Sequence, residues 1–196
     1  MKRLYLLGLS ILVVLLFVGC GKAPDAQLKQ ATAALQAAEA AGAPQYAADA
    51  WSRAKQAVDQ FKAELDKQAK RFGLFRSYGK ARTLAAQALK LSDQALADAN
   101  SKKAQMRSDV TGMIGDITAS LESARKQLAR LPRIKNAAAL KSSLNTAAGQ
   151  LDQARKDLAA GALDNAQAVA AKARDRITSV LKAIEAATGG SKSRKK

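Results

Sequence analysis

The chain has 196 residues and a strongly positive charge, with 33 lysines and arginines against 16 acidic residues. It has no histidine and a single cysteine, so it lacks the usual histidine-based metal ligand sets and the serine–histidine and cysteine–histidine catalytic pairs. Gly112 and Gly115 follow no predicted strand and mark no phosphate-binding loop. We therefore expect no enzyme, no cofactor and no metal site.

The first residues have the pattern of a secretory signal. Lys2 and Arg3 precede an uncharged run from Leu4 to Val18, and a small residue stands directly before Cys20. A membrane-spanning helix needs about 20 apolar residues, so this run is too short for one. An uncleaved anchor and an ordinary signal peptide with an incidental cysteine are the weaker alternatives.

The stretch Phe17-Val18-Gly19-Cys20 resembles the lipobox of bacterial lipoproteins. The resemblance implies a signal peptide over residues 1–19, cleavage before Cys20, and lipidation of the Cys20 sulfur with diacylglycerol and palmitate-type chains. It implies a water-soluble mature protein held on a membrane by its lipid, with a net charge of +15 because residues 1–19 remove two basic side chains and no acidic one. Gly21 replaces the aspartate that retains enterobacterial lipoproteins in the inner membrane, which favours the outer membrane, facing the periplasm.

After Cys20 the sequence predicts an all-α protein. Alanine, the best helix former, is abundant, only three prolines occur, and no segment shows sustained alternation of β-branched residues. Apolar residues instead recur every three or four positions, as on one face of a helix. The expected helices cover residues 25–41, 45–72, 78–131, 137–158 and 163–187.

Short interruptions separate these helices and imply antiparallel neighbours. They are Gly42-Ala43-Pro44, Phe72-Gly73-Leu74-Phe75, Pro132 and Ala160-Gly161-Ala162, while Gly189-Gly190 is expected to end the last helix. The fold class is thus antiparallel helical hairpins in a coiled-coil-like bundle of about five helices, with one long central helix. A break of the long helix near Asn100 is the alternative.

The few aromatic residues are expected to serve packing. Trp51, Phe61 and Phe72 lie on the apolar stripe of the second helix and are predicted to be in the core. Tyr46 is predicted to pack over the Gly42 turn. We see no ligand-binding role for them.

The stretch from Ala37 to Ala47, followed by Ala54-Lys55-Gln56-Ala57, resembles the DUF4398 family. The resemblance covers about residues 24–105 and departs at Ala48, where many members have a proline. It implies a bacterial envelope protein with tetratricopeptide-like helical hairpins and no settled activity. We expect a DUF4398-like region over residues 20–105, a second hairpin region over 106–188 and a disordered basic tail over 189–196.

Basic residues form runs without acidic ones, as between Lys67 and Arg82. The candidate contacts for an anionic polymer are Lys67, Lys70, Arg71, Arg76, Lys80, Arg82, Lys192, Arg194, Lys195 and Lys196. Two interpretations stay open: a solvated face that keeps the chain soluble, or a surface for anionic envelope lipid or glycan. Nucleic acid fits the charge but is not expected in the exported compartment that the signal implies.

The terminal Lys196 resembles the lysine by which the murein lipoprotein family is joined to peptidoglycan, although Ser193 replaces the tyrosine of that pattern. We expect a lipid-anchored, non-enzymatic structural or interaction module of the cell envelope. The alternative is a binding protein for anionic envelope lipid or glycan. Peptidoglycan, anionic lipid and an envelope protein all remain candidate partners, and the oligomeric state stays open.

Overall fold

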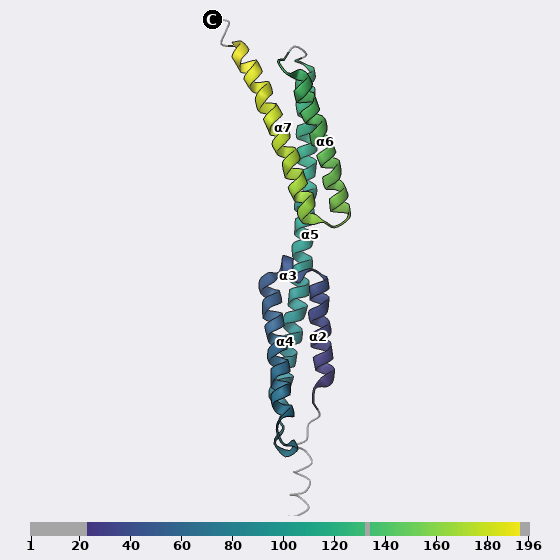
Figure 1. Ribbon diagram of the computed structural model, residues 1–196, viewed down its shortest axis with the longest axis vertical. Coiled ribbons are helices and arrows are strands. Elements are labelled where there is room, and N and C mark those ends of the chain that lie inside the picture. Colours follow the sequence, from purple (N-terminus) through teal and green to yellow (C-terminus); the bar gives the residue numbers. More distant parts are fainter. Residues whose placement is uncertain (1–22, 132–133, 193–196) are drawn as a thin grey trace, which may run out of the picture. The chain divides into compact units, whose positions relative to one another are not determined.

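The computed structural model describes residues 23–131 and 134–192 (Figure 1). Cys20 and the tail residues Arg194, Lys195 and Lys196 lie outside these ranges. The described elements are α2 (Asp25–Ala40), α3 (Ala43–Tyr46), α4 (Ala48–Ala69), the 3-10 helix η1 (Gly73–Phe75), α5 (Gly79–Ala129), α6 (Ala137–Ala159) and α7 (Leu163–Lys192). Within the two described ranges there is no strand, which confirms the all-α prediction with its long central helix.

The chain divides into two compact units, residues 1–102 and 103–196. Helix α5 runs through this boundary, so its first part belongs to unit 1 and its second part to unit 2. Asn100, Gly112 and Gly115 all lie inside the continuous helix α5. This excludes the predicted alternative of a break near Asn100.

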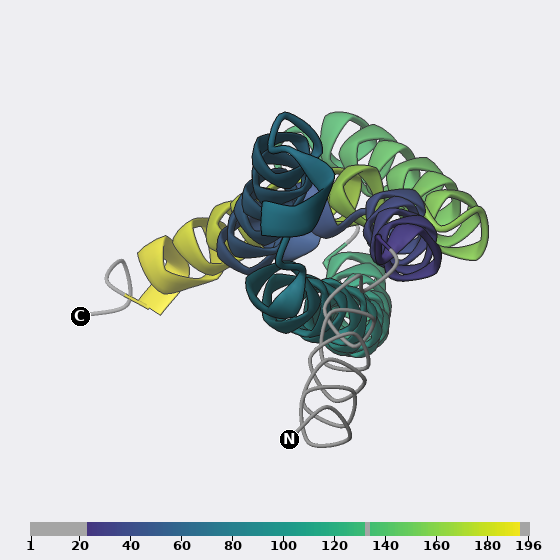
Figure 2. The ribbon, with the colours of Figure 1, turned by 90° about the horizontal axis from the view of Figure 1, so that it is seen from below.

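Unit 1 is a bundle of α2, α4 and the first part of α5, which lie side by side when viewed end-on (Figure 2). Its core is built mainly of alanines, which let the helix backbones approach closely. One layer, near the start of α2 and the end of α4, contains Ala31, Ala57, Val58, Phe61, Ala81, Ala85 and Ala88. A second layer, near the end of α2 and the start of α4, contains Ala38, Ala43, Ala50, Ala54, Ala95 and Ala99, with Trp51 partly buried against it.

The turn between α2 and α3 depends on glycine. Gly42 has φ 81°, in the left-handed region that glycine adopts without a steric penalty. A Cβ atom at this position would meet Cδ2 of Tyr46 at 3.0 Å. The prediction that Tyr46 packs over Gly42 is therefore confirmed.

Unit 2 is a bundle of the second part of α5 with α6 and α7. Its main buried core cluster consists of Val110, Ile114, Ile117, Leu121, Ala124, Leu144, Ala147, Leu151, Ala154, Ala166, Ala170, Ala173, Ile177, Val180 and Ile184. Gly161, with φ 79°, makes the predicted turn between α6 and α7. Arg155 of α6 donates a hydrogen bond to Thr118 Oγ1 of α5 across 2.8 Å.

The end of α7 differs from the prediction. The helix continues through Gly189 and Gly190 and ends at Lys192. Glycine lowers helix propensity by about 1 kcal/mol relative to alanine but keeps its backbone N–H donor, so it does not oblige a helix to end.

Candidate functional site

The largest apolar side chains exposed on the described part of the chain lie together between α4 and α5. Phe72 is 72% exposed, Leu74 72% and Phe75 73%. We call residues 70–78 the α4–α5 loop; η1 forms its middle. The prediction that Phe72 lies in the core is wrong, because α4 ends at Ala69 and the helical stripe ends with it.

The buried face of α4 also turns near its end. Leu65 is half-buried and Ala69 exposed, whereas Glu64 is 7% exposed and Gln68 4% exposed. The apolar stripe that ran through Leu65 and Ala69 is thus replaced by two polar side chains one helical turn apart. Buried polar groups need hydrogen-bond partners, and these two find them in each other and in the loop.

Gln68 links α4 to the far side of the loop. Its Nε2 donates to Glu64 Oε1 across 2.7 Å, and its Oε1 accepts a hydrogen bond of 3.1 Å from the backbone N–H of Ser77. Lys80, in the first turn of α5, places Nζ 3.5 Å from Glu64 Oε2. These contacts join the two ends of the loop at its base.

Arg76 closes the loop on its exposed side. Its Nε donates to the carbonyl oxygen of Arg71 at 2.9 Å and its Nη2 to that of Ala69 at 3.0 Å. The last carbonyls of an α-helix lack partners within the helix, and a basic side chain there also meets the negative end of the helix dipole. Arg76 therefore fixes the loop to the end of α4.

The hydrogen bond from Gln68 is the main cause that lowers the pKa of the Glu64 carboxyl below its ordinary value. Burial acts in the opposite direction, and the positive charges of Lys80 and Lys67 add to the lowering. The carboxylate is therefore held in its charged form and serves as the acceptor on which the base of the loop is built.

The structure brings six of the predicted contact residues to this end of unit 1, where all are exposed: Lys67, Lys70, Arg71, Arg76, Lys80 and Arg82. Arg76 and Lys80 are engaged with the loop and with Glu64. The side chains of Lys70, Arg71 and Arg82 form no ion pair with any described residue. Lys192 ends α7, in unit 2, and the other predicted tail residues lie outside the described ranges.

The described chain starts at the same end of unit 1 as the α4–α5 loop (Figure 1). Leu28 and Ala31, from the first turns of α2, pack in the layer that also contains Phe61 of α4 and Ala81 of α5. Pro24, just before α2, is buried. The start of α2 and the exposed apolar loop thus share one end of this bundle.

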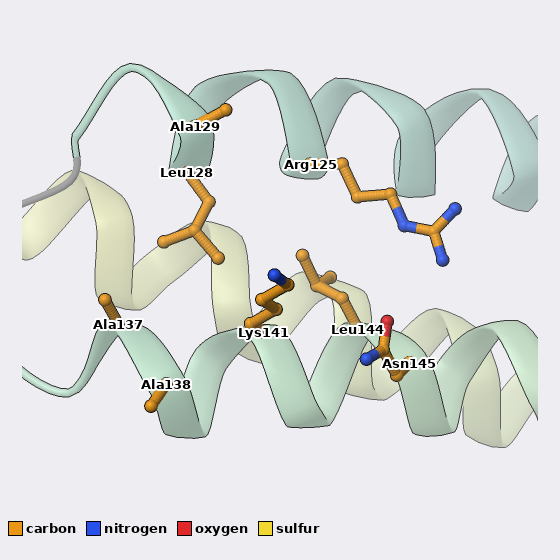
Figure 3. Close-up of a pocket in the computed structure, with 8 residues that line it drawn as sticks. All are labelled: Arg125, Leu128, Ala129, Ala137, Ala138, Lys141, Leu144 and Asn145. Carbon is orange, nitrogen blue, oxygen red and sulfur yellow. The ribbon is translucent and has the colours of Figure 1, made fainter.

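Unit 2 contains a separate cavity of about 430 Å³ between α5 and α6. Leu128 of α5 points toward α6, and Lys141 and Leu144 of α6 point toward α5 (Figure 3). Arg125 and Asn145 also line it, and none of its described lining residues is acidic. It offers apolar surface and positive charge but no acid–base pair.

In the described ranges, no group of three or more acidic side chains is placed to hold a metal ion. No described helix is both long enough and apolar enough to span a membrane.

The sequence analysis did not identify Glu64 and Gln68 as residues that build this site. The signal that could have found them is the Glu-x-x-x-Gln spacing, which places both side chains on one helix face. Glu64 follows Phe61 by three residues, so this pair lies on the buried face of α4.

Residues 26–110 match the family DUF4398, a domain of unknown function. This confirms the predicted resemblance over unit 1 and the first residues of unit 2. The comparisons with curated proteins and with solved structures found no match.

Proposed function

We propose that this protein is a lipid-anchored component of the bacterial cell envelope, attached through Cys20, that acts as a non-enzymatic structural or interaction module. The DUF4398 match and the lipobox-like stretch before Cys20 support this assignment. We place it on the outer membrane, facing the periplasm, because Gly21 follows the cysteine.

One observation carries the proposal: Pro24, four residues after Cys20, is buried at the end of the unit 1 bundle where α2 begins. Four residues of extended chain reach at most about 14 Å. A lipid on Cys20 would therefore hold this end of unit 1 close to the bilayer. The helical surfaces of the protein would then be available to an envelope partner.

Mass spectrometry of protein isolated from bacterial membranes tests the anchor. We expect an N-terminal peptide that begins at Cys20 and carries the mass of diacylglycerol. The Cys20→Ser variant should carry no lipid and should not be cleaved before residue 20. An intact Met1 or a free thiol on Cys20 in the natural protein would refute the anchor.

A second candidate function is binding of an anionic envelope glycan or lipid. The exposed cations of unit 1 favour it, because Lys70, Arg71 and Arg82 have no acidic partner among the described residues. Saturable binding to peptidoglycan or lipopolysaccharide that weakens with added salt would support it. A protein partner retained in high salt would favour the first candidate instead.

The covalent form of this second candidate is attachment of Lys196 to peptidoglycan. Muramidase digestion of purified cell walls should then release a fragment that ends at Lys196 joined to a muropeptide. Cell walls free of such a fragment would exclude the tether and leave the lipid anchor untouched.

A further inference from the structure

We propose that the α4–α5 loop is a membrane-contact site, which inserts Phe72, Leu74 and Phe75 into the headgroup region of a bilayer that contains anionic lipids. This goes beyond the proposed lipid anchor, because it assigns a contact to the folded protein that does not need the lipid on Cys20.

The first argument is the concentration of apolar surface. Three large apolar side chains, each more than 70% exposed, occur within four residues. A cluster of this kind on a soluble protein marks a surface that another apolar phase covers. Transfer of phenylalanine and leucine side chains out of water is favourable.

The second argument is that the loop is held in shape. Its base is joined by the Gln68–Ser77 and Gln68–Glu64 hydrogen bonds, and Arg76 binds the carbonyls of Ala69 and Arg71. The chain between these points is one 3-10 turn, closed by the hydrogen bond from Phe75 N to Phe72 O at 2.9 Å. The apolar side chains therefore need little further ordering on binding, which lowers its entropic cost.

The third argument is charge. From residue 67 to residue 82 the chain has six basic side chains and no acidic one. The acidic side chains at this end are Asp25, Glu64 and Asp66, and Glu64 is already paired with Lys80. Basic side chains beside an apolar segment are attracted to anionic headgroups while the apolar residues enter the boundary with the acyl chains.

Charge and position indicate which surface covers the α4–α5 loop. A second copy of the chain would bring a cluster of the same sign against this one, and like charges repel. An anionic bilayer has the complementary charge. It is also the surface nearest to this end of unit 1 if Cys20 carries a lipid, because α2 begins here, five residues after Cys20.

Binding to vesicles tests the contact without the lipid anchor. The protein would be residues 20–196 with Cys20→Ser, which keeps every described residue. We expect it to cosediment with vesicles of phosphatidylcholine and phosphatidylglycerol and to bind pure phosphatidylcholine much more weakly. The triple variant Phe72→Ser, Leu74→Ser, Phe75→Ser should lose about tenfold or more in affinity. The pair Phe72→Leu, Phe75→Leu should retain most of it.

A matched charge control separates loop contact from overall charge. Lys70→Gln with Arg71→Gln should weaken binding, whereas Lys172→Gln with Arg176→Gln, which removes the same charge from exposed positions on α7, should not. Equal losses in both pairs would mean adsorption by net charge alone and would overturn the proposal.

Tryptophan fluorescence tests insertion directly, because Trp51 is the only tryptophan and lies in the other core layer of unit 1. In a Trp51→Phe background, the emission of the Phe75→Trp variant should shift to the blue on vesicles and be quenched by brominated lipids. Trp51 of the parent protein should not respond.

Absence of quenching in the Phe75→Trp variant, or full vesicle binding by the triple serine variant, would overturn the proposal. So would self-association in the absence of vesicles that the triple variant abolishes, since the loop would then bind a second copy. Circular dichroism checks that each variant is folded. None of these outcomes depends on the lipid state of Cys20, which mass spectrometry decides separately.

Discussion

Gln68 donates a hydrogen bond of 2.7 Å to Glu64 from one turn further along α4, and both side chains are buried. Glu64 also forms an ion pair with Lys80, and the side-chain oxygen of Gln68 accepts a hydrogen bond from the backbone N–H of Ser77. An uncharged apolar pair at these positions would fill the same space but could not hold the loop. The pair therefore connects core packing to the shape of the exposed surface.

Replacement of Gln68 by alanine should destabilise unit 1 by about 1–3 kcal/mol, since it leaves the buried Glu64 oxygen and the Ser77 N–H without their partner. Gln60→Ala, at an exposed position on the same helix, should change stability by less than about 0.5 kcal/mol. Urea unfolding followed by Trp51 fluorescence measures both, because the only tryptophan lies in unit 1. Equal effects of the two substitutions would contradict a structural role for the pair.

The Glu64 carboxyl makes the stability of unit 1 dependent on pH. The pKa of this carboxyl is lower in the folded protein than in the unfolded chain, so its contribution to stability is fully present above the unfolded pKa and is lost as the pH falls through the folded pKa. The urea midpoint should fall on acidification in the parent protein and fall less in Glu64→Gln. Asp66→Asn removes an equal charge from an exposed site on α4 and is the control.

Three glycines should respond differently to alanine. Gly42→Ala should be the most damaging, at about 1–2 kcal/mol for the left-handed backbone plus the cost of moving the Tyr46 ring. Gly161→Ala should cost only the backbone term, since nothing lies within 4 Å of the added Cβ. Gly149→Ala, in the middle of α6 with open space around it, should stabilise by up to about 1 kcal/mol. Thermal unfolding measures all three variants. A stabilising effect of Gly42→Ala would contradict the left-handed backbone conformation of Gly42.

The helices and their turns follow from local rules that the sequence displays. Apolar residues at steps of three and four predict α2, α4, α5, α6 and α7, and glycine at Gly42 and Gly161 predicts turns that need positive φ. The same spacing persists on both sides of Asn100, and it predicts the continuity of α5 through this residue.

The loop surface did not follow from these rules. Phe72 continues the apolar spacing of α4, and periodicity alone cannot show that the helix ends at Ala69 and leaves the next turn outside the bundle. The burial of Glu64 depends on Ser77 and Lys80, which are distant along the chain and come close only in the folded protein. Sequence spacing within a single helix contains no information about such partners.

The apolar core of unit 2 provides a last test of the packing. Leu151 is 1% exposed and belongs to the buried cluster that α5, α6 and α7 share. Leu151→Ala should cost about 2–5 kcal/mol, because the lost methyl groups leave a cavity that rigid helices fill only in part. Lys156→Ala, exposed on the same helix, should cost less than about 0.5 kcal/mol. Circular dichroism during thermal unfolding checks both variants. A loss below about 1 kcal/mol for Leu151→Ala would mean that α6 is not packed as described, since a buried leucine cannot be truncated so cheaply in a close-packed core.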